Sequence, residues 1–282
     1  MKLNILGAGG ATAIPRPLCC CEVCEQARAK GITYARTGPS LYIDHGGGIL
    51  IDTPEEVRYQ IEREQIKSLS HIFYTHWHPD HTQGMRIIEQ IKHKRNQPNY
   101  QPLNVYIPAN DIKNFQIHCA PLWYFEGRRW ANIIEFDDRS PIEIDNLFIT
   151  PIDFKRPDRV RYGFLIQDEH KKVMYAPCSI FGAQTDHNWR NLDYLIMESG
   201  WAGPTSMIRA KEHGKTMYQD HISLEENVDL SLQLQPKQTI LTHIDGGRHR
   251  DLGGDYDLLC CYMKGVLGAE IAIAYDGMRI EL

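Results

Sequence analysis

Short apolar runs recur along the whole chain, and Gly, Asp or Pro residues bound each of them. Lengths of about five residues and a high content of β-branched and aromatic side chains are typical of strands. The predicted strands are LNILG (3–7), SLYI (40–43), GILIDT (48–53), HIFYTH (71–76), LNVYIP (103–108), NLFITPID (146–153), YGFLIQ (162–167), KVMYAP (172–177), YLIMES (194–199), QTILTHI (238–244) and AEIAIAYDG (269–277).

Longer patterned stretches predict helices over 54–66, 82–95, 110–118, 187–192, 223–234 and 255–266. The first of these begins with Pro54, which is favoured at a first helical position, and then places Val57 and Ile61 on one face. In SLEENVDLSLQL, Ser223 is followed three positions later by Glu226, which predicts a capping box at the start of the helix.

Strand-rich halves interleaved with helices predict an α/β fold, an αββα sandwich of two mixed β-sheets flanked by helices. The sequence contains no internal repeat and no linker-like stretch. We therefore expect residues 1–282 to form a single domain.

The composition limits the classes of function. The chain has 282 residues, a net charge of -5, 42% hydrophobic residues and 24% charged residues, which is typical of a soluble globular protein. The negative charge argues against nucleic acid as a partner. No stretch approaches the roughly 20 apolar residues of a membrane span, and MKLNILGAGG reaches a glycine turn too soon for a signal peptide. We expect a cytoplasmic protein, without a membrane partner and with reduced thiols.

A cluster of histidines follows one predicted strand in YTHWHPDHTQG (74–84). His76 and His78 are two positions apart at the predicted strand end, which points both rings to one side. Asp80 and His81 follow the turn at Pro79, at the entry to a helix predicted from Thr82. Imidazole and carboxylate groups are ligands for zinc, manganese or iron. A merely solvated loop is the alternative, and it does not explain this spacing.

The HxHxDH motif resembles the signature of the metallo-β-lactamase superfamily. LGAGGATAIPRPLCCCEVC (6–24), GGGILIDTPEEVRYQI (46–61) and ILTHI (240–244) extend the resemblance to the PhnP-like branch, which includes phosphoribosyl cyclic phosphate phosphodiesterases. The similarity runs from Leu3 to about Gly277. It implies a fold of the αββα type and an active site that holds one or two divalent metals, namely zinc, manganese or iron.

The resemblance implies that His76 and His78 bind a first metal and that Asp80, His81 and His243 bind a second one. Two features of the family pattern are missing. The usual additional histidine of the first site should fall within 151–164, which contains no histidine, and the usual bridging aspartate aligns with Cys178. Cys178 is then either a ligand or a buried apolar filler, and centres with one and with two metals both remain open.

Within the segment that lacks the histidine, Lys155 and Arg156 are candidates for binding an anionic substrate, although solvated surface charges are the alternative. His221 stands shortly before the strand that carries the late ligand. The resemblance implies that it protonates the leaving group, as a neutral imidazole can, whereas helix capping is the alternative role.

Four of the eight cysteines lie within six positions, and Cys19, Cys21 and Cys24 form a CxCxxC motif. By resemblance this motif is a knuckle insertion at about 15–28 that binds one structural zinc. A fourth ligand should come from the loop after His243, where His249 is preferred and Asp245 is the alternative. Cys20 is an alternative zinc ligand in place of one of the neighbouring cysteines.

An aromatic segment, FQIHCAPLWYFEGRRW (115–130), leaves three roles open: a cover over the metal cleft, a homodimer contact, or core packing.

The leading functional hypothesis is a metal-dependent hydrolase that acts on a small anionic phosphodiester, such as a cyclic phosphate. Metal-activated water is then the nucleophile, Asp80 orients it, and His221 is the acid. One alternative is a mononuclear non-haem iron oxygenase or a PQQ-biosynthesis-like protein of the same fold, because two histidines and a carboxylate also compose the iron facial triad. Another alternative is a repurposed accessory or binding protein.

Overall fold

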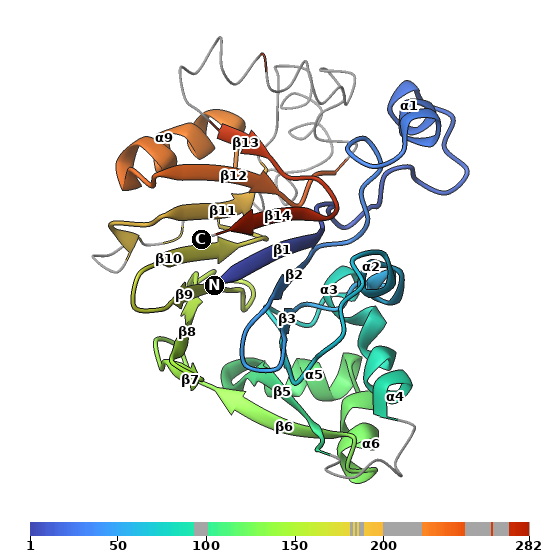
Figure 1. Ribbon diagram of the computed structural model, residues 1–282, viewed down its shortest axis with the longest axis vertical. Helices are drawn as coiled ribbons and strands as arrows, with labels where there is room; N and C mark the ends of the chain where they lie inside the picture. Colours follow the sequence, from blue (N-terminus) through green and yellow to red (C-terminus); the bar gives the residue numbers. More distant parts are fainter. Residues whose placement is uncertain are drawn as a thin grey trace.

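Two β-sheets pack face to face in the computed structural model, and helices cover their outer faces (Figure 1). The structure describes residues 1–92, 101–180, 183, 185, 189–199, 222–245, 261 and 271–281. Within these residues each sheet contains seven strands. The predicted αββα fold class is therefore confirmed.

The first sheet combines antiparallel and parallel pairing. Its order is β14 (Met278–Glu281), β1 (Lys2–Gly7), β2 (Ser40–Ile43), β3 (Ile49–Ile51), β4 (His71–Phe73), β5 (Leu103–Pro108) and β6 (Ala131–Phe136). The pairs from β14 to β3 are antiparallel, whereas those from β3 to β6 are parallel. The first and last strands of the chain are thus neighbours, and the labelled termini lie close together (Figure 1).

The second sheet has the same division. Its order is β13 (Ile271–Ile273), β12 (Gln238–Thr242), β11 (Tyr194–Glu198), β10 (Lys172–Ala176), β9 (Tyr162–Gln167), β8 (Leu147–Asp153) and β7 (Ile142–Ile144). Strands β10 to β13 are parallel, and β9, β8 and β7 continue the sheet in antiparallel pairs. Each sheet therefore has a parallel half, whose strands end at one edge.

Helices on the outer face of the first sheet are α2 (Val57–Arg63), α3 (Pro79–Thr82), η1 (Gln83–Arg86), α4 (Ile87–Lys92), η2 (Ala109–Asp111), α5 (Ile112–His118) and α6 (Pro121–Gly127). On the outer face of the second sheet lies α9 (Leu224–Leu234), with the predicted capping box of Ser223 and Glu226. The knuckle segment carries α1 (Glu22–Lys30), which extends from one side of the molecule (Figure 1).

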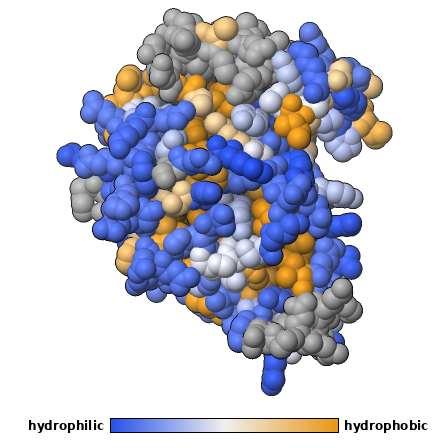
Figure 2. All heavy atoms as spheres, in the orientation of Figure 1, coloured by the Kyte–Doolittle hydropathy of each residue, from blue (hydrophilic) through white to orange (hydrophobic). Residues whose placement is uncertain are grey.

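Alternating side chains divide the apolar residues into three layers. Ile5 of β1 faces the second sheet, whereas its neighbour Leu6 faces the helices. Between the sheets, the rings of Phe73 and Phe164 meet edge to face, with their centroids 5.5 Å apart. Charged and polar residues cover much of the face shown in Figure 2.

Several elements differ from the sequence prediction. Strands β6, β7 and β14 and helices α1 and α6 were not predicted, because their apolar patterns are short. The helical region predicted from Thr82 begins earlier, at Pro79, and consists of α3, η1 and α4 in series. Strand β4 ends at Phe73, so that His76 and His78 lie in the following loop and not at a strand end as predicted. The helices predicted over 187–192 and 255–266 lie partly outside the described residues.

The aromatic segment packs mainly against the outer face of the first sheet. Phe115, Phe125 and Trp130 are buried there, and only Tyr124 among its aromatic residues is largely exposed. The segment therefore contributes to the core of this layer. No helix in the described part of the chain has the length and apolar character needed to cross a bilayer.

Candidate metal centre

The candidate ligands gather where parallel strands of both sheets end. His76, Asp80 and His81 follow β4, Cys178 follows β10, and His243 directly follows β12. In α/β proteins the carboxyl ends of parallel strands meet at one edge, and functional loops leave the sheet there. The fold thus brings residues more than 160 positions apart into one cluster, since the ring nitrogens of His81 and His243 are in contact.

Two groups of ligand atoms meet in this cluster. In the first group, a carboxylate oxygen (Oδ2) of Asp80 lies 3.3 Å from Nε2 of His81 and 3.5 Å from Nε2 of His243. The two Nε2 atoms are 3.3 Å apart. The second group consists of His76, His81 and Cys178, and in each group the ligand atoms lie within 4.8 Å of one another. His81 belongs to both groups.

These residues fit a divalent metal. Nε2 of His76 is buried and has no hydrogen-bond partner among the described residues, so that a ligand lone pair in this position is otherwise unsatisfied. Imidazole, carboxylate and thiolate together match the donors that zinc and iron accept. The structure therefore brings together five of the predicted ligands: His76, Asp80, His81, Cys178 and His243.

Asp52 orients His81. Its carboxylate oxygen Oδ2 lies 2.7 Å from Nδ1 of His81 and accepts a hydrogen bond from the hydroxyl of Thr75, whereas Oδ1 accepts one from the backbone N–H of Thr75. The carboxylate therefore holds the Nδ1 proton and leaves Nε2 of His81 for the centre. This role of Asp52 was not predicted from the sequence. The signal was the polar residue that directly follows the apolar strand ILI.

Electrostatics at the centre favour a charged carboxylate at Asp80 and neutral imidazoles at His76 and His78, whereas the carboxylates of Asp80 and Asp52 raise the pKa of His81 against the effect of burial. Burial alone would raise the pKa of Asp80, but His81 and His243 hold it well below its usual value. Burial, with the charge of Arg161, lowers the pKa of His78 to about 4. Burial likewise lowers the pKa of His76 well below its usual value. At neutral pH the rings of His76 and His78 each carry one lone pair that can bind a cation or accept a hydrogen bond.

The structure does not place His78 in either ligand group. Its ring instead contacts Arg161, whose Nη2 lies 2.9 Å from Nε2 and 3.2 Å from Nδ1 of His78. Arg161 is only 1% exposed and stands directly before β9. Arg161 was not predicted as a site residue, although it belongs to the segment that lacks the expected histidine.

The two basic residues of that segment that were predicted to bind substrate, Lys155 and Arg156, have different surroundings. Nζ of Lys155 lies 2.9 Å from Asp138 and 3.2 Å from Asp153, and its side chain is 55% exposed. Arg156 is partly buried, and neither residue belongs to a ligand group. Contact of Lys155 or Arg156 with a substrate stays a prediction. His221 and His249 lie outside the described residues.

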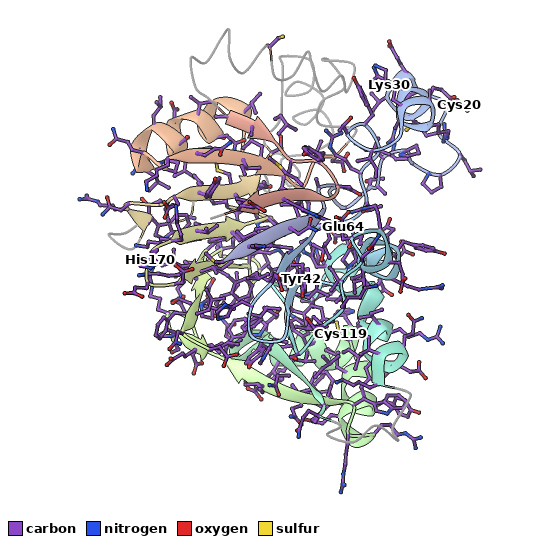
Figure 3. The ribbon with its side chains drawn as sticks, viewed as in Figure 1. Cys20, Lys30, Tyr42, Glu64, Cys119 and His170 are labelled. Atoms are coloured by element: carbon purple, nitrogen blue, oxygen red, sulfur yellow. The ribbon has the colours of Figure 1, made fainter. Side chains whose placement is uncertain are left out.

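Cys19, Cys21 and Cys24 form a third group, in which the sulfur atoms lie within 4.8 Å of one another. The backbone N–H of Cys21 and the adjacent thiols lower the pKa of Cys19 to about 6, which favours the thiolate that zinc binds. Cys20 is exposed and lies beside α1 (Figure 3). A carboxylate oxygen of Asp245, the alternative fourth ligand, accepts a hydrogen bond from Thr12.

Tight backbone turns allow the segments that carry the candidate ligands to approach one another. Gly10 lies against the ring of His243, because a Cβ atom on Gly10 would be 3.1 Å from Nδ1 of that ring. The adjacent Gly9 bridges to Ile244 and so joins the ends of β1 and β12. Asp52 and His243 themselves have positive φ angles of 63° and 55°, a strained conformation that is common at functional sites.

Two mixed sheets, outer helices and a ligand cluster at the strand ends define a protein of the metallo-β-lactamase fold. Residues 47–244 match the family model of the β-lactamase superfamily domain, and the chain belongs to this family.

The chain is similar in sequence to proteins that are named for two different activities. An octanoyltransferase of Porphyromonas gingivalis is 29% identical over 285 residues, which include 100% of this chain but only 53% of that protein. The chain thus spans about half the length of this relative. A ribonuclease Z of Pyrobaculum neutrophilum is 23% identical over 300 residues, which cover 89% of this chain and 91% of the relative.

Solved structures agree on the fold. A diphosphatase from the PhnP family has a TM-score of 0.75 and 23% identity, and the match covers 100% of this chain and 96% of that one. Zn2+-bound PqqB from Methylobacterium extorquens has a TM-score of 0.74 and 16% identity, with 100% of both chains covered.

Proposed function

We propose that the chain is a metal-dependent hydrolase of phosphodiesters, with a small, cyclic phosphate as the simplest substrate. The observation that carries the proposal is the convergence of Asp80, His81 and His243, whose ligand atoms are 3.3–3.5 Å apart at the ends of strands from both sheets. The names diphosphatase and ribonuclease Z among similar proteins support chemistry at a phosphate ester.

A metal held by Asp80, His81 and His243, with Cys178 beside them, would lower the pKa of bound water and polarise a phosphoryl oxygen. Asp80 stays ionised in this environment and accepts a hydrogen bond from the attacking water, which orients the water toward phosphorus. Asp52 keeps Nε2 of His81 directed at the centre. Cleavage transfers the hydroxyl of water to phosphorus and releases an alcohol.

The departing alkoxide needs a proton. His221 is proposed as its donor on the resemblance described above, and His249 as the fourth ligand of the zinc bound by Cys19, Cys21 and Cys24. Zinc is the preferred metal for the active site, because a thiolate at position 178 favours zinc or iron over manganese. A cytoplasmic location, a small anionic partner and a homodimer remain part of the proposal.

Turnover of bis(p-nitrophenyl) phosphate by the zinc-loaded protein tests the proposal. We expect His81→Ala to lower kcat/KM by at least about 100-fold, because the substitution removes a ligand and the Asp52 contact. His170→Ala is the matched control, since His170 is highly exposed at the turn between β9 and β10 (Figure 3). Equal turnover by the His81→Ala variant and the parent protein would refute the hydrolase.

A second candidate is oxidative chemistry with one iron ion. The observation that favours it is the set of two histidines and one carboxylate formed by Asp80, His81 and His243. Elemental analysis of protein purified without air separates the candidates. Iron bound to this group, with oxygen consumption and no phosphodiester turnover, would favour the oxidative candidate. A group that binds neither zinc nor iron would favour the repurposed accessory protein.

A further inference from the structure

Two ligand groups share one histidine nitrogen. His81 belongs to both groups, but its Nδ1 is occupied by the hydrogen bond to Asp52. A metal-bound imidazole that keeps its Nδ1 proton on Asp52 has a single lone pair, on Nε2, and one lone pair binds one metal ion. If the ion lies with Asp80 and His243, only His76 and Cys178 remain for a second ion. Two protein ligands are fewer than the three or four that zinc sites provide.

A second metal ion beside these remaining ligands would lie close to the positive charge of Arg161. The rings of His76 and His78 are neighbours, with centroids 4.8 Å apart, and Arg161 contacts His78 through Nη2. A guanidinium group has five N–H donors and no acceptor, so it cannot be a metal ligand. The nitrogen of His78 that faces it accepts a hydrogen bond from Arg161 and is not available to a metal. A divalent ion placed there would also be repelled by the charge of Arg161.

The guanidinium is buried without full satisfaction of its donors. Nη1 donates to the backbone carbonyl of Val160, Nη2 contacts His78, and the side chain of Cys178 is a further hydrogen-bond partner of the guanidinium. Nε has no hydrogen-bond partner among the described residues, although the side chain is only 1% exposed. A buried charge of this kind is costly unless an acceptor binds it. A phosphate oxygen is a suitable acceptor, since guanidinium and phosphate form paired, charge-assisted hydrogen bonds.

We propose that Arg161 takes the place of a second metal ion: the centre holds one ion, and the guanidinium supplies the other positive charge and binds a non-bridging oxygen of the substrate phosphate. The binding of a substrate phosphate by Arg161 rests on the proposed function, whereas the number of metal ions at the centre does not. Arg161 is thus a substrate-binding residue, and its positive charge, unlike that of a metal ion, is not removed by chelators.

The first test counts metal ions in protein equilibrated with zinc, by elemental analysis and by anomalous diffraction, which separates the centre from the cysteine knuckle. We expect one ion at the centre of the parent protein. In Arg161→His, the new imidazole should join His76 and His78 and add a second ion. A second ion between His76 and His78 of the parent protein, or a single ion in a folded Arg161→His variant, would overturn the proposal.

The second test measures the binding of inorganic phosphate to the zinc-loaded protein by calorimetry. Arg161→Gln should weaken phosphate binding by about 10- to 100-fold, the usual loss for a hydrogen bond to a charged group. Arg161→Lys keeps the charge but loses the paired donors, so the expected loss of phosphate affinity is smaller. This variant provides the measurement if Arg161→Gln is unstable. Lys237→Gln is the control, because Lys237 pairs with Asp193 at the opposite end of β12 from His243.

Unchanged phosphate affinity in folded Arg161→Gln would overturn the substrate-binding role. Failure of this proposal is distinguishable from failure of the proposed function. One metal ion and phosphate binding that depends on Arg161, without phosphodiester turnover, would refute only the proposed function. Turnover with two metal ions at the centre would refute only the role of Arg161.

Discussion

At the scale of single residues, the centre depends on buried polar side chains that hold one another in position. Asp52 binds His81, Thr75 binds Asp52, and Arg161 contacts His78. Each of these contacts selects which ring nitrogen is available to the centre. The histidines are therefore not equivalent, although the motif places them within six positions.

The Asp52 contact gives a prediction for metal affinity. Asp52→Asn removes the charge that holds the Nδ1 proton of His81, and we expect zinc affinity at the centre to fall about 10- to 100-fold. Competition with a chelating indicator measures this change. Asp44→Asn is a matched control, because Asp44 follows β2 as Asp52 follows β3 but is exposed. Equal affinities for Asp52→Asn and the parent protein would show that the carboxylate does not support His81.

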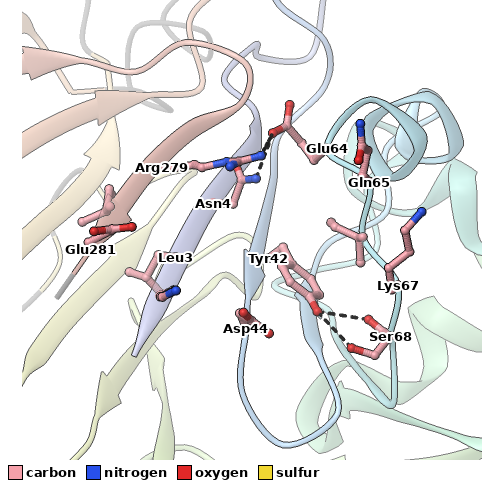
Figure 4. Close-up of a pocket in the computed structure, with 13 residues that line it drawn as sticks. Leu3, Asn4, Tyr42, Asp44, Glu64, Gln65, Lys67, Ser68, Arg279 and Glu281 are labelled. Carbon is pink, nitrogen blue, oxygen red and sulfur yellow. Dashed lines mark hydrogen bonds and ion pairs between the residues drawn. The ribbon is translucent and has the colours of Figure 1, made fainter.

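At the scale of elements, hydrogen bonds connect the end of α2 to both terminal strands of the chain. Glu64, at the C-terminal end of α2, accepts hydrogen bonds from Asn4 of β1 and Arg279 of β14 (Figure 4). These residues line a cavity of about 370 Å3 that contains none of the candidate ligands. The contacts connect the beginning and the end of the polypeptide to one helix, which supports the edge of the first sheet next to β1.

The environment of Glu64 predicts a dependence of stability on pH. Burial alone would raise its pKa, but hydrogen bonds from Arg63 and Asn4 and the charge of Arg63 lower it below the ordinary value of 4.5. A lowered pKa in the folded state stabilises the fold above that ordinary value, and the contribution disappears as pH falls through the folded-state pKa.

Glu64→Gln should therefore lower the free energy of unfolding by about 1–2 kcal/mol at neutral pH and by less in acid. Urea unfolding of metal-free protein at several pH values measures the difference. Glu62→Gln, an exposed position on the same helix, should leave stability nearly unchanged. A Glu64→Gln difference that stays constant down to acid pH would contradict the assignment.

At the scale of the whole molecule, one apolar layer holds the two sheets together and so sets the distance between the ligand loops. Phe164 of β9 lies in this layer and meets Phe73 of β4 and Phe136 of β6, with ring centroids 5.5 Å and 5.8 Å apart. The ligands come from both sheets, because His81 follows β4 and His243 follows β12. Packing between the sheets is therefore a condition for metal binding.

Phe164→Ala should lower the free energy of unfolding by about 3–5 kcal/mol, the usual cost of a buried phenylalanine, and weaken zinc binding at the centre. Denaturant unfolding and metal titration check both effects. Phe148→Ala on β8 is the control with a small expected effect, because Phe148 is 42% exposed. Zinc affinity that is unchanged in Phe164→Ala would show that the ligand loops hold their positions independently of the layer between the sheets.

Features that depend on local spacing were predictable from the sequence alone. Short apolar runs located eleven strands, the pair Ser223 and Glu226 located the start of α9, and HxHxDH located most of the candidate ligands. Local patterns suffice here because strand and helix periods are set by backbone geometry within a few residues.

Contacts between side chains from distant segments were not predictable from local sequence patterns. The pairing of Arg161 with His78, the support of His81 by Asp52 and the position of Cys178 beside His76 join segments that are distant in sequence. No local period encodes such contacts, since they depend on how the two sheets pack and where each strand ends. The sequence therefore specified a candidate metal-binding loop, and the packing of the two sheets determined which histidines of that loop belong to the candidate ligand groups.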